Sequence, residues 1–385
     1  MKKFTFIIVI AAALVVGCVS LLIINKMNSS ALDKQKVSIS FHTSFPEDYK
    51  LSNKGKIRIE TPMVYELLNI VIALSDMDKD YSSLSYKQTP YYESVIDHFA
   101  AFKDHPIVKQ IADANEKVGY SWVRNLFAYS LEGDSIIRGD IYKSDNIYKV
   151  CDPFIDGLSD FAKKSDFMAF YNANTNYYQD QNQLISKTIP ISQIQIWLES
   201  NFPIKHDAYT IIISPLTGGS HNTFQYEEDS QYSEIVMFIS SIQVINDNSN
   251  ASTGTLDSAA SRMLFTEIDH NYVNPITNID ENIKEVVSAF SDIKKWNSKE
   301  SYGRPALTFN EYMTWGIYLL YAHDTYQEDI YNATASETIE FMNYRGCIRF
   351  DQFYKKILEL YINRSPNEKV SDLYPKILYW CKSNK

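Results

Sequence analysis

The sequence predicts an α+β fold, dominated by helices, with one small antiparallel sheet packed beside a late block of helices. Two short segments near the start, residues 37–42 and 56–60, alternate apolar and polar side chains as half-buried strands do. Two β-branched runs, residues 208–214 and 234–245, give a second strand signal in the middle of the chain. Most other segments repeat apolar residues every three or four positions, which is the period of an amphipathic helix.

The first half of the domain, about residues 61–205, is expected to be helical. Thr61 is a good N-cap and Pro62 suits the first helical position, and an amphipathic run that contains Leu67 and Leu68 follows them. Further helices are expected at residues 91–103, 105–114, 122–131, 153–170 and 192–200.

The middle of the chain holds the expected sheet, because the two β-branched runs are close enough in sequence to pair. Residues 246–255 are the most loop-like stretch. We expect residues 37–385 to form one large domain, whose parts cover about 61–205, 206–325 and 326–385. Helices are expected after the loop at residues 257–271, 279–296, 310–321, 335–343, 351–362 and 372–381.

The composition indicates a globular protein that does not bind nucleic acid. Of the 385 residues, 45% are hydrophobic and 22% are charged, which leaves enough apolar side chains for a sizeable core. The net charge is −10, with 47 acidic against 37 basic residues, and no basic stripe with interleaved aromatics occurs. Because so acidic a chain repels phosphate backbones, nucleic acid is excluded as an expected partner.

The N-terminus predicts a membrane anchor within residues 1–24. Lys2 and Lys3 precede the uncharged residues 4–24, which as a helix would span about 32 Å and could cross a bilayer. Cys18 follows small and apolar residues in the pattern at which bacterial lipoproteins are cleaved and acylated, so a lipid anchor on Cys18 is the second interpretation. Both anchors stay open.

Either anchor places the folded domain outside the cytoplasm. The two lysines hold the short N-terminal end inside, and the polar residues 25–36 form a tether. We therefore expect the domain on the extracytoplasmic face of a bacterial membrane, single-pass or lipid-anchored, with the membrane as its partner.

Three cysteines remain beyond Cys18, at positions 151, 347 and 381. Their spacing matches no zinc ribbon or redox motif. Small buried hydrophobic residues are one interpretation, and a bridge between Cys347 and Cys381 is the other.

The residues with the clearest chemical potential lie in Thr266-Glu267-Ile268-Asp269-His270. Glu267 and His270 are three positions apart, so one helix face would offer a carboxylate and an imidazole to one metal. Spacing alone carries little weight, since about one such pair is expected by chance in a chain of this composition. The context adds weight, because Glu311 opens a predicted helix about 40 residues later.

The segment is similar to a His-Glu-x-x-His motif in which Thr266 stands where the first histidine would be. The chain resembles a family of exported bacterial proteins of unknown function that look like gluzincin-type zinc metallopeptidases. The resemblance implies that Glu267 is the general base and that His270 and Glu311 are zinc ligands. It is carried by residues 63–67, 91–99, 105–106, 214–216, 266–275 and 309–312.

The missing first ligand leaves the site open to several arrangements. Glu267 could itself bind zinc, with Asp269 as the base, or His221 could complete the ligand set from the loop between the strands. The resemblance implies a membrane-anchored, extracytoplasmic, metallopeptidase-like protein that acts on peptides or proteins, active or degenerate. The alternative, which Thr266 favours, is a non-catalytic protein that binds peptide or glycan or has a structural role in the envelope.

Overall fold

The computed structural model describes residues 32–37, 39–75, 77, 84–229, 231–246 and 253–384. The expected anchor at residues 1–24, including Cys18, lies outside these residues. Among the described helices, none combines the length and the apolar character that a bilayer span needs.

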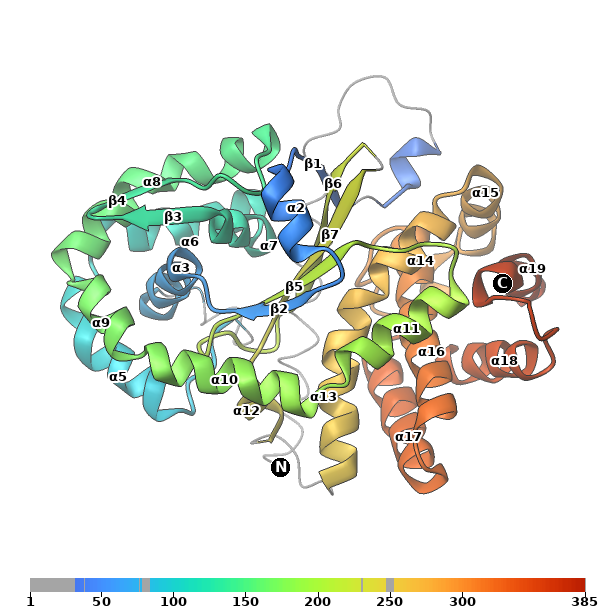
Figure 1. Ribbon diagram of the computed structural model, residues 1–385. Helices are drawn as coiled ribbons and strands as arrows, with labels where there is room; N and C mark the ends of the chain where they lie inside the picture. The colour runs from blue at the N-terminus through green and yellow to red at the C-terminus, as the bar shows by residue number, and fades with distance from the viewer. Residues whose placement is uncertain are drawn as a thin grey trace. The chain divides into compact units, whose positions relative to one another are not determined.

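The described chain divides into two compact units. Unit 1 consists of Ser40–Thr188 and His206–Asn248, and unit 2 consists of Ile189–Lys205, Ser249–Lys385 and the described residues before Ser40. The five-stranded sheet lies in unit 1, whereas the described part of unit 2 consists of helices and loops (Figure 1).

The sheet of unit 1 is mixed, with the strand order β1-β6-β7-β5-β2. Only β6 and β7 pair antiparallel, while β1 with β6, β7 with β5, and β5 with β2 are parallel. All six residues of β5 are buried, as expected for an inner strand that is covered on both faces. The strands are β1 (Ser40–His42), β2 (Ile57–Glu60), β5 (Ala208–Ile213), β6 (Asn222–Glu228) and β7 (Tyr232–Ile239).

The predicted α+β class with dominant helices is confirmed, but the sheet is not the small antiparallel one expected. The two β-branched runs do pair, as β5 and β7, yet they run parallel because β6 lies between them in sequence and occupies the other side of β7. Strand β6 was not predicted. Its signal was the alternation of buried Phe224 and Tyr226 with the less buried Gln225 and Glu227.

The helices of unit 1 surround α3 (Met63–Leu74), which is buried from Val64 to Ala73. Helices α5, α6 and α8 and the hairpin β3–β4 pack around it (Figure 1). The other elements of the unit are α2 (Glu47–Asn53), α5 (Pro90–Phe99), α6 (Pro106–Val118), α7 (Tyr120–Val123), β3 (Tyr129–Glu132), β4 (Ser135–Arg138), α8 (Asp145–Lys164), α9 (Phe167–Ala173), α10 (Thr175–Thr188) and α12 (Ile242–Asn246).

Two predicted helices of unit 1 differ in the structure. Residues 122–131 form the end of α7, a 3₁₀ turn and the strand β3 rather than one helix. The helix expected at 153–170 begins earlier, at Asp145, and carries Pro153 in its interior. It stops before Asp166, whose φ of 53° is left-handed and breaks the helix, and α9 then begins.

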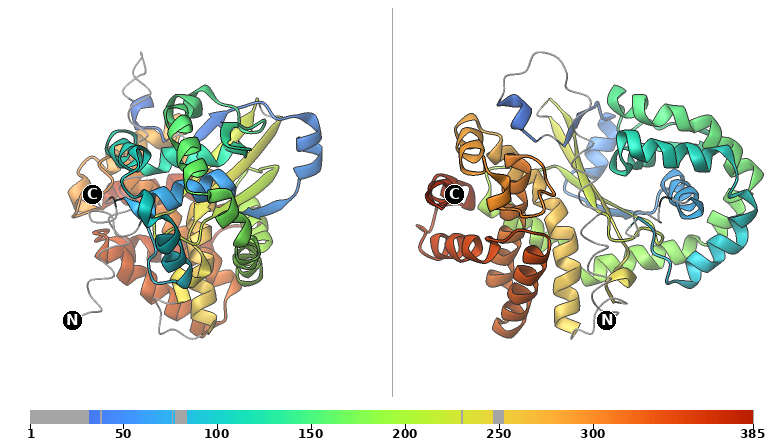
Figure 2. Two further views of the ribbon diagram at one scale, coloured as in Figure 1. Left: turned by 90° about the vertical axis from the view of Figure 1, so that its left-hand side faces the viewer. Right: turned by 180° about the vertical axis from the view of Figure 1, so that it is seen from behind.

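Unit 2 is built around α16 (Pro305–Thr325), which is buried from Ala306 to Ala322 on all sides. Helices α13, α16 and α17 pack against one another and run side by side (Figures 1 and 2). The remaining helices of the unit are α11 (Ile191–Asn201), α13 (Thr253–Ile268), α14 (His270–Thr277), α15 (Asp280–Ala289), α17 (Glu328–Tyr344), α18 (Phe350–Ile362) and α19 (Tyr374–Ser383).

Cys151, Cys347 and Cys381 are all buried and unbridged. The structure therefore contains small apolar thiols and not a bridge between Cys347 and Cys381. Burial raises the pKa of the Cys347 thiol to about 12, which keeps it protonated and unreactive.

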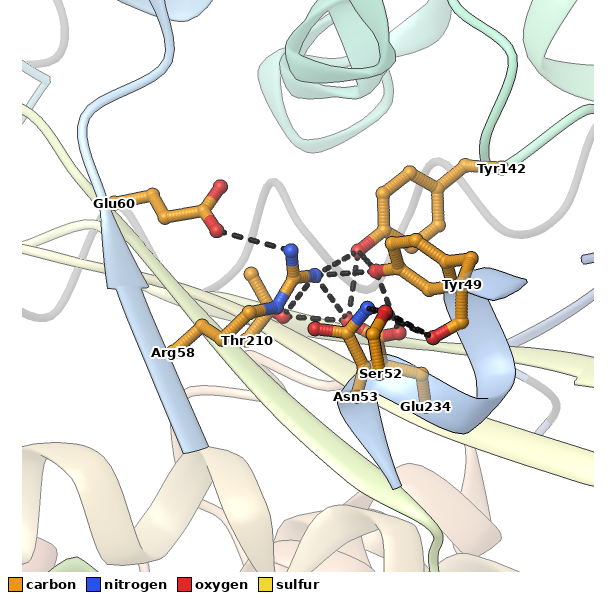
Figure 3. Close-up of polar contacts among 8 residues, drawn as sticks. All are labelled: Tyr49, Ser52, Asn53, Arg58, Glu60, Tyr142, Thr210 and Glu234. Carbon is orange, nitrogen blue, oxygen red and sulfur yellow. Dashed lines mark hydrogen bonds and ion pairs between the residues drawn. The ribbon is translucent and has the colours of Figure 1, made fainter. Parts of the chain in front are cut away.

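A buried carboxylate, Glu234 on β7, gathers polar groups from several elements of unit 1 (Figure 3). It accepts hydrogen bonds from Arg58 Nη2 at 2.9 Å, from the Tyr142 hydroxyl at 2.7 Å and from the Tyr49 hydroxyl at 3.0 Å. The Thr210 hydroxyl also donates to it. The network joins α2, β2, β5 and β7, so it fixes how these elements meet.

A second buried carboxyl, Glu66 on α3, accepts a hydrogen bond from the Tyr91 hydroxyl at 2.6 Å, and the Tyr91 and Tyr178 hydroxyls lie 2.7 Å apart. Burial raises the pKa of Glu66 to about 7, although hydrogen bonds from Tyr91 and Ser214 oppose the shift. Three of the segments that carry the family resemblance, those with Glu66, Tyr91 and Ser214, therefore meet inside unit 1.

Removing Glu234 should destabilise unit 1 far more than removing Glu60, although both carboxylates bind Arg58. Glu234→Ala removes the buried partner of the Arg58 guanidinium and leaves it only the half-exposed Glu60. This should cost about 3 kcal/mol, the low end for buried pairs, because 24% of the Arg58 side chain is exposed. Glu60 is 42% exposed, so Glu60→Ala should cost less than about 1 kcal/mol. Urea denaturation followed by circular dichroism measures both, and equal losses would contradict the structural role of Glu234.

Glu66 should make the protein less stable as the pH rises towards neutrality. Its pKa is about 7 when folded against an ordinary 4.5, so its stabilising contribution is complete below about 4.5 and is lost as the pH passes 7. The contribution amounts to roughly 3 kcal/mol. Glu66→Gln should remove this slope from urea midpoints measured between pH 4.5 and 8. The control Glu93→Gln changes an exposed carboxylate of α5 and should keep the slope; a Glu66→Gln protein with the wild-type slope would refute the assignment.

Candidate functional site

The segment from Thr266 to His270 lies at a junction between two helices of unit 2. Helix α13 ends at Ile268 and α14 begins at His270, so the single helix expected at 257–271 is wrong. The chain stays helical through Asp269, whose N–H donates to Phe265 O at 2.9 Å. Asn271 explains the interruption, because its side-chain amide donates to the carbonyls of Glu267 and Ile268 and competes with the helix hydrogen bonds.

The predicted apolar stripe of this segment holds it in the core of unit 2. Leu264, Phe265, Ile268 and Tyr272 have no measurable exposure. Their burial fixes the junction, and it carries Glu267 and Asp269 into the interior as well, since both are almost fully buried.

His270 faces α16 at the position of Glu311. Its Nε2 lies 3.8 Å from Glu311 Oε1, and its Nδ1 lies 3.5 Å from the Thr314 hydroxyl. Glu311 is not in the first turn of its helix, as the sequence suggested, because α16 begins at Pro305. The structure therefore brings together two of the residues predicted to share one metal.

The other oxygen of Glu311, Oε2, accepts three hydrogen bonds. Arg345 Nη2 and the Tyr302 hydroxyl each lie 3.2 Å from it, and Trp315 Nε1 lies 3.3 Å from it. Arg345 also donates to the Tyr302 hydroxyl. One side of the carboxylate is thus held by protein donors while the other side faces His270.

Burial sets the charge state of these groups. It lowers the pKa of His270 to about 4, with a further contribution from Arg345, so the imidazole is neutral at physiological pH. Burial raises the pKa of Glu311 to about 8, whereas the ion pair with Arg345 favours its carboxylate form. The pKa of Asp269 is raised well above its usual range, first by burial and then by the charges of Glu267 and Glu311. The site concentrates buried carboxyl groups whose charged forms disfavour one another, and a bound cation would favour those charged forms.

The other predicted site residues do not complete a ligand set. His221 belongs to unit 1, where its Nε2 lies 3.0 Å from the Ser240 hydroxyl and burial lowers its pKa to about 3. Thr266, at the place of the first histidine, donates to the Arg262 carbonyl at 3.0 Å. Within the described ranges, no three or more His, Cys, Asp or Glu side chains are arranged to hold a metal ion. The residues present fit two zinc ligands, not three.

The residues that hold Glu311 were not predicted from the sequence. Trp315 is four positions after Glu311 on the same helix, so the i to i+4 rule could have found it. Tyr302 lies in the loop before α16, and Arg345 follows the end of α17, 34 positions after Glu311. Only the packing of α17 against α16 brings Arg345 to the site.

Comparison with known proteins gives one match. No curated protein and no solved structure matches the chain significantly. A family model matches residues 133–379, from the turn of the β3–β4 hairpin to α19, and this range includes His270, Glu311 and Arg345. Because the match covers well over half of the chain, the protein belongs to the family described as Domain of unknown function (DUF4932).

Proposed function

We propose that the protein is a zinc-binding, metallopeptidase-like protein that acts on peptides or proteins, with its site at His270 and Glu311. The observation that carries the proposal is the distance of 3.8 Å between His270 Nε2 and Glu311 Oε1. Two ligands of one tetrahedral zinc, each about 2.1 Å from the metal, lie about 3.4 Å apart. A small side-chain adjustment would bring both atoms to one ion.

The charge state of His270 and the orientation of the Glu311 side chain support this proposal. A lowered pKa keeps His270 neutral, which is the form that binds metals. Glu311 Oε1 faces His270, whereas Oε2 accepts hydrogen bonds from protein donors. In metal sites, such hydrogen bonds from residues around the ligands orient the ligating side chains. When bound, zinc supplies a Lewis acid that polarises a carbonyl and lowers the pKa of a bound water to about 7.

Glu267 and Asp269 are the acid–base candidates of the proposed site. Both are buried, and the charge of Glu267 acts on Asp269. In the first arrangement Glu267 takes the proton of the attacking water, as the family resemblance implies. In the second, Glu267 would have to move to become the third ligand, because the described side chains bring only two together, and Asp269 would take the proton.

The second candidate function is a peptide- or glycan-binding protein without catalysis. The observation that favours it is the position of Thr266, whose hydroxyl bonds to its own helix instead of providing a ligand. Two ligands alone bind zinc weakly, and a degenerate site would keep the fold and lose the reaction.

The purified protein should bind one zinc ion, and His270 and Glu311 should be responsible for it. His270→Ala and Glu311→Gln should each weaken zinc binding at least about tenfold, because each removes one of two ligands. Elemental analysis gives the stoichiometry, and competition with a chromophoric chelator gives the affinity. His323→Ala is the matched control. Like Glu311, His323 lies on α16, but its side chain contacts Asp324. A wild-type protein that takes up no zinc contradicts the proposal.

Two further variants separate the peptidase from the binding protein in the same assay. Thr266→His should tighten zinc binding by restoring the missing ligand. Glu267→Gln should abolish cleavage of a fluorogenic peptide library and keep the zinc if Glu267 is the base, whereas it should also release zinc if Glu267 is a ligand. Peptide binding without cleavage, by wild-type and Thr266→His proteins alike, would favour the binding protein.

We also propose that an N-terminal anchor holds the protein at the extracytoplasmic face of a bacterial membrane, because residues 4–24 are uncharged and follow two lysines. The full chain should sediment with membranes, and a chain without residues 1–30 should be soluble and folded. Cys18→Ala should release the protein and lower its mass by the lipid if Cys18 is acylated. Unchanged mass and membrane retention would leave the spanning segment as the anchor, and a soluble full chain would refute both.

A further inference from the structure

We infer that Arg345 is a positioning residue, which fixes the Glu311 carboxylate so that Oε1 alone is presented towards His270. The inference rests on the proposed function, because it describes how the second zinc ligand is held. Arg345 follows the end of α17 and is not one of the residues proposed to bind zinc or to act as the general base.

Three protein donors hold the Oε2 atom of Glu311. Arg345, Tyr302 and Trp315 all lie 3.2–3.3 Å from this one oxygen, whereas Oε1 is 3.8 Å from the imidazole. A carboxylate can bind a metal through one oxygen or both. With Oε2 committed to protein donors, Glu311 is restricted to binding through Oε1.

Arg345 is rigid enough to impose this geometry. Only 3% of its side chain is exposed, and its guanidinium carbon lies 5.4, 5.1 and 5.6 Å from the ring centroids of Tyr302, Trp315 and Phe341. Its Nη1 contacts Met342 Sδ at 3.6 Å. A planar guanidinium packed among aromatic rings loses little freedom when it binds a carboxylate, unlike a lysine ammonium.

Among the three donors, Arg345 is the one that carries charge and joins the other groups. It donates both to Glu311 and to the Tyr302 hydroxyl, so it also places the second donor. Trp315 and Tyr302 are neutral donors, which contribute less than a charge-assisted hydrogen bond. Loss of Arg345 should therefore disturb the carboxylate more than loss of either neutral donor.

The matched comparison for Arg345 is Arg262. The Arg262 guanidinium carbon lies 5.9 Å from the same Trp315 ring, and Nη1 donates to the Thr338 hydroxyl at 3.4 Å. Arg262 thus contributes positive charge and aromatic packing in the same neighbourhood without binding Glu311 in the described structure. Replacing it tests charge and packing without touching the proposed positioning contact.

The test uses zinc affinity, measured by chelator competition on the whole protein, and crystal structures of the zinc-free variants. Arg345→Met should weaken zinc binding roughly 10- to 100-fold, the usual loss when an outer-shell partner is removed. Arg345→Lys should recover part of this loss, and Arg262→Met should stay within about twofold of wild type. In zinc-free Arg345→Met, Glu311 should leave its position beside His270, whereas it should keep that position in Arg262→Met.

Unchanged zinc affinity with an unmoved Glu311 in Arg345→Met would overturn the inference. If the wild-type protein binds no zinc, the proposed function fails, and the position of Glu311 in the two zinc-free crystal structures still decides whether Arg345 positions it. If Arg345→Met does not fold, Tyr302→Phe and Arg345→Lys replace it. Each of these variants removes some of the hydrogen bonds to Glu311 Oε2 but keeps a positive charge beside the carboxylate. If Glu311 keeps its position in both of these variants and both bind zinc with wild-type affinity, Arg345 is not a positioning residue.

Discussion

The ion pair between Arg345 and Glu311 is the interaction on which the architecture of unit 2 depends. Helix α16 is buried on every side, so each polar residue that it carries must find its partners inside the protein. Glu311 finds them in Arg345 just after α17, in Tyr302 on the loop before α16 and in Trp315 on α16 itself. This requirement fixes how the end of α17 and that loop pack against the central helix. The same hydrogen bonds leave Oε1 of Glu311 directed towards His270. The contacts that pack the helices are therefore also the contacts that orient the proposed ligand.

Unit 1 meets the same constraint in a different way. Strand β5 is buried along its whole length and β7 along nearly all of it. Glu234 on β7 is accommodated because Arg58 on β2 and the hydroxyls of Tyr49, Tyr142 and Thr210 all reach it. Here both carboxylate oxygens of Glu234 join elements, and the guanidinium is shared with a second carboxylate, Glu60. The two networks differ in one respect that matters for function: the carboxylate of Glu311 keeps one oxygen directed to an imidazole, whereas Glu234 is engaged by donors from four side chains.

Periodicity predicted most helices, because their burial follows from local pattern. The apolar residues of α3, α11 and α18 repeat along one or more faces. The observed start of α3 and both ends of α11 and α18 lie within two residues of those expected. The direction of β5 relative to β7 was not predictable from the sequence. A strand buried on both faces has the same continuous apolar pattern whether it pairs parallel or antiparallel. The break at Asp269 depends on the side-chain amide of Asn271, and the contact of Arg345 with Glu311 depends on tertiary packing. In the candidate site, the sequence therefore indicated His270 and Glu311 as partners but not the groups that hold them.

The position of β2 at the sheet edge has a consequence for any fragment cut at the limits of the family match. The match begins at residue 133, whereas β2, which pairs with β5 over four residues, ends at Glu60. A fragment that starts at the match would expose the backbone of β5, a strand whose six residues are all buried, as an unprotected and apolar edge. Such edges recruit strands from other molecules, so the fragment should self-associate, and it would also lack the arginine that neutralises Glu234. A stable fragment of this protein should therefore include β2 as well as the region that defines its family.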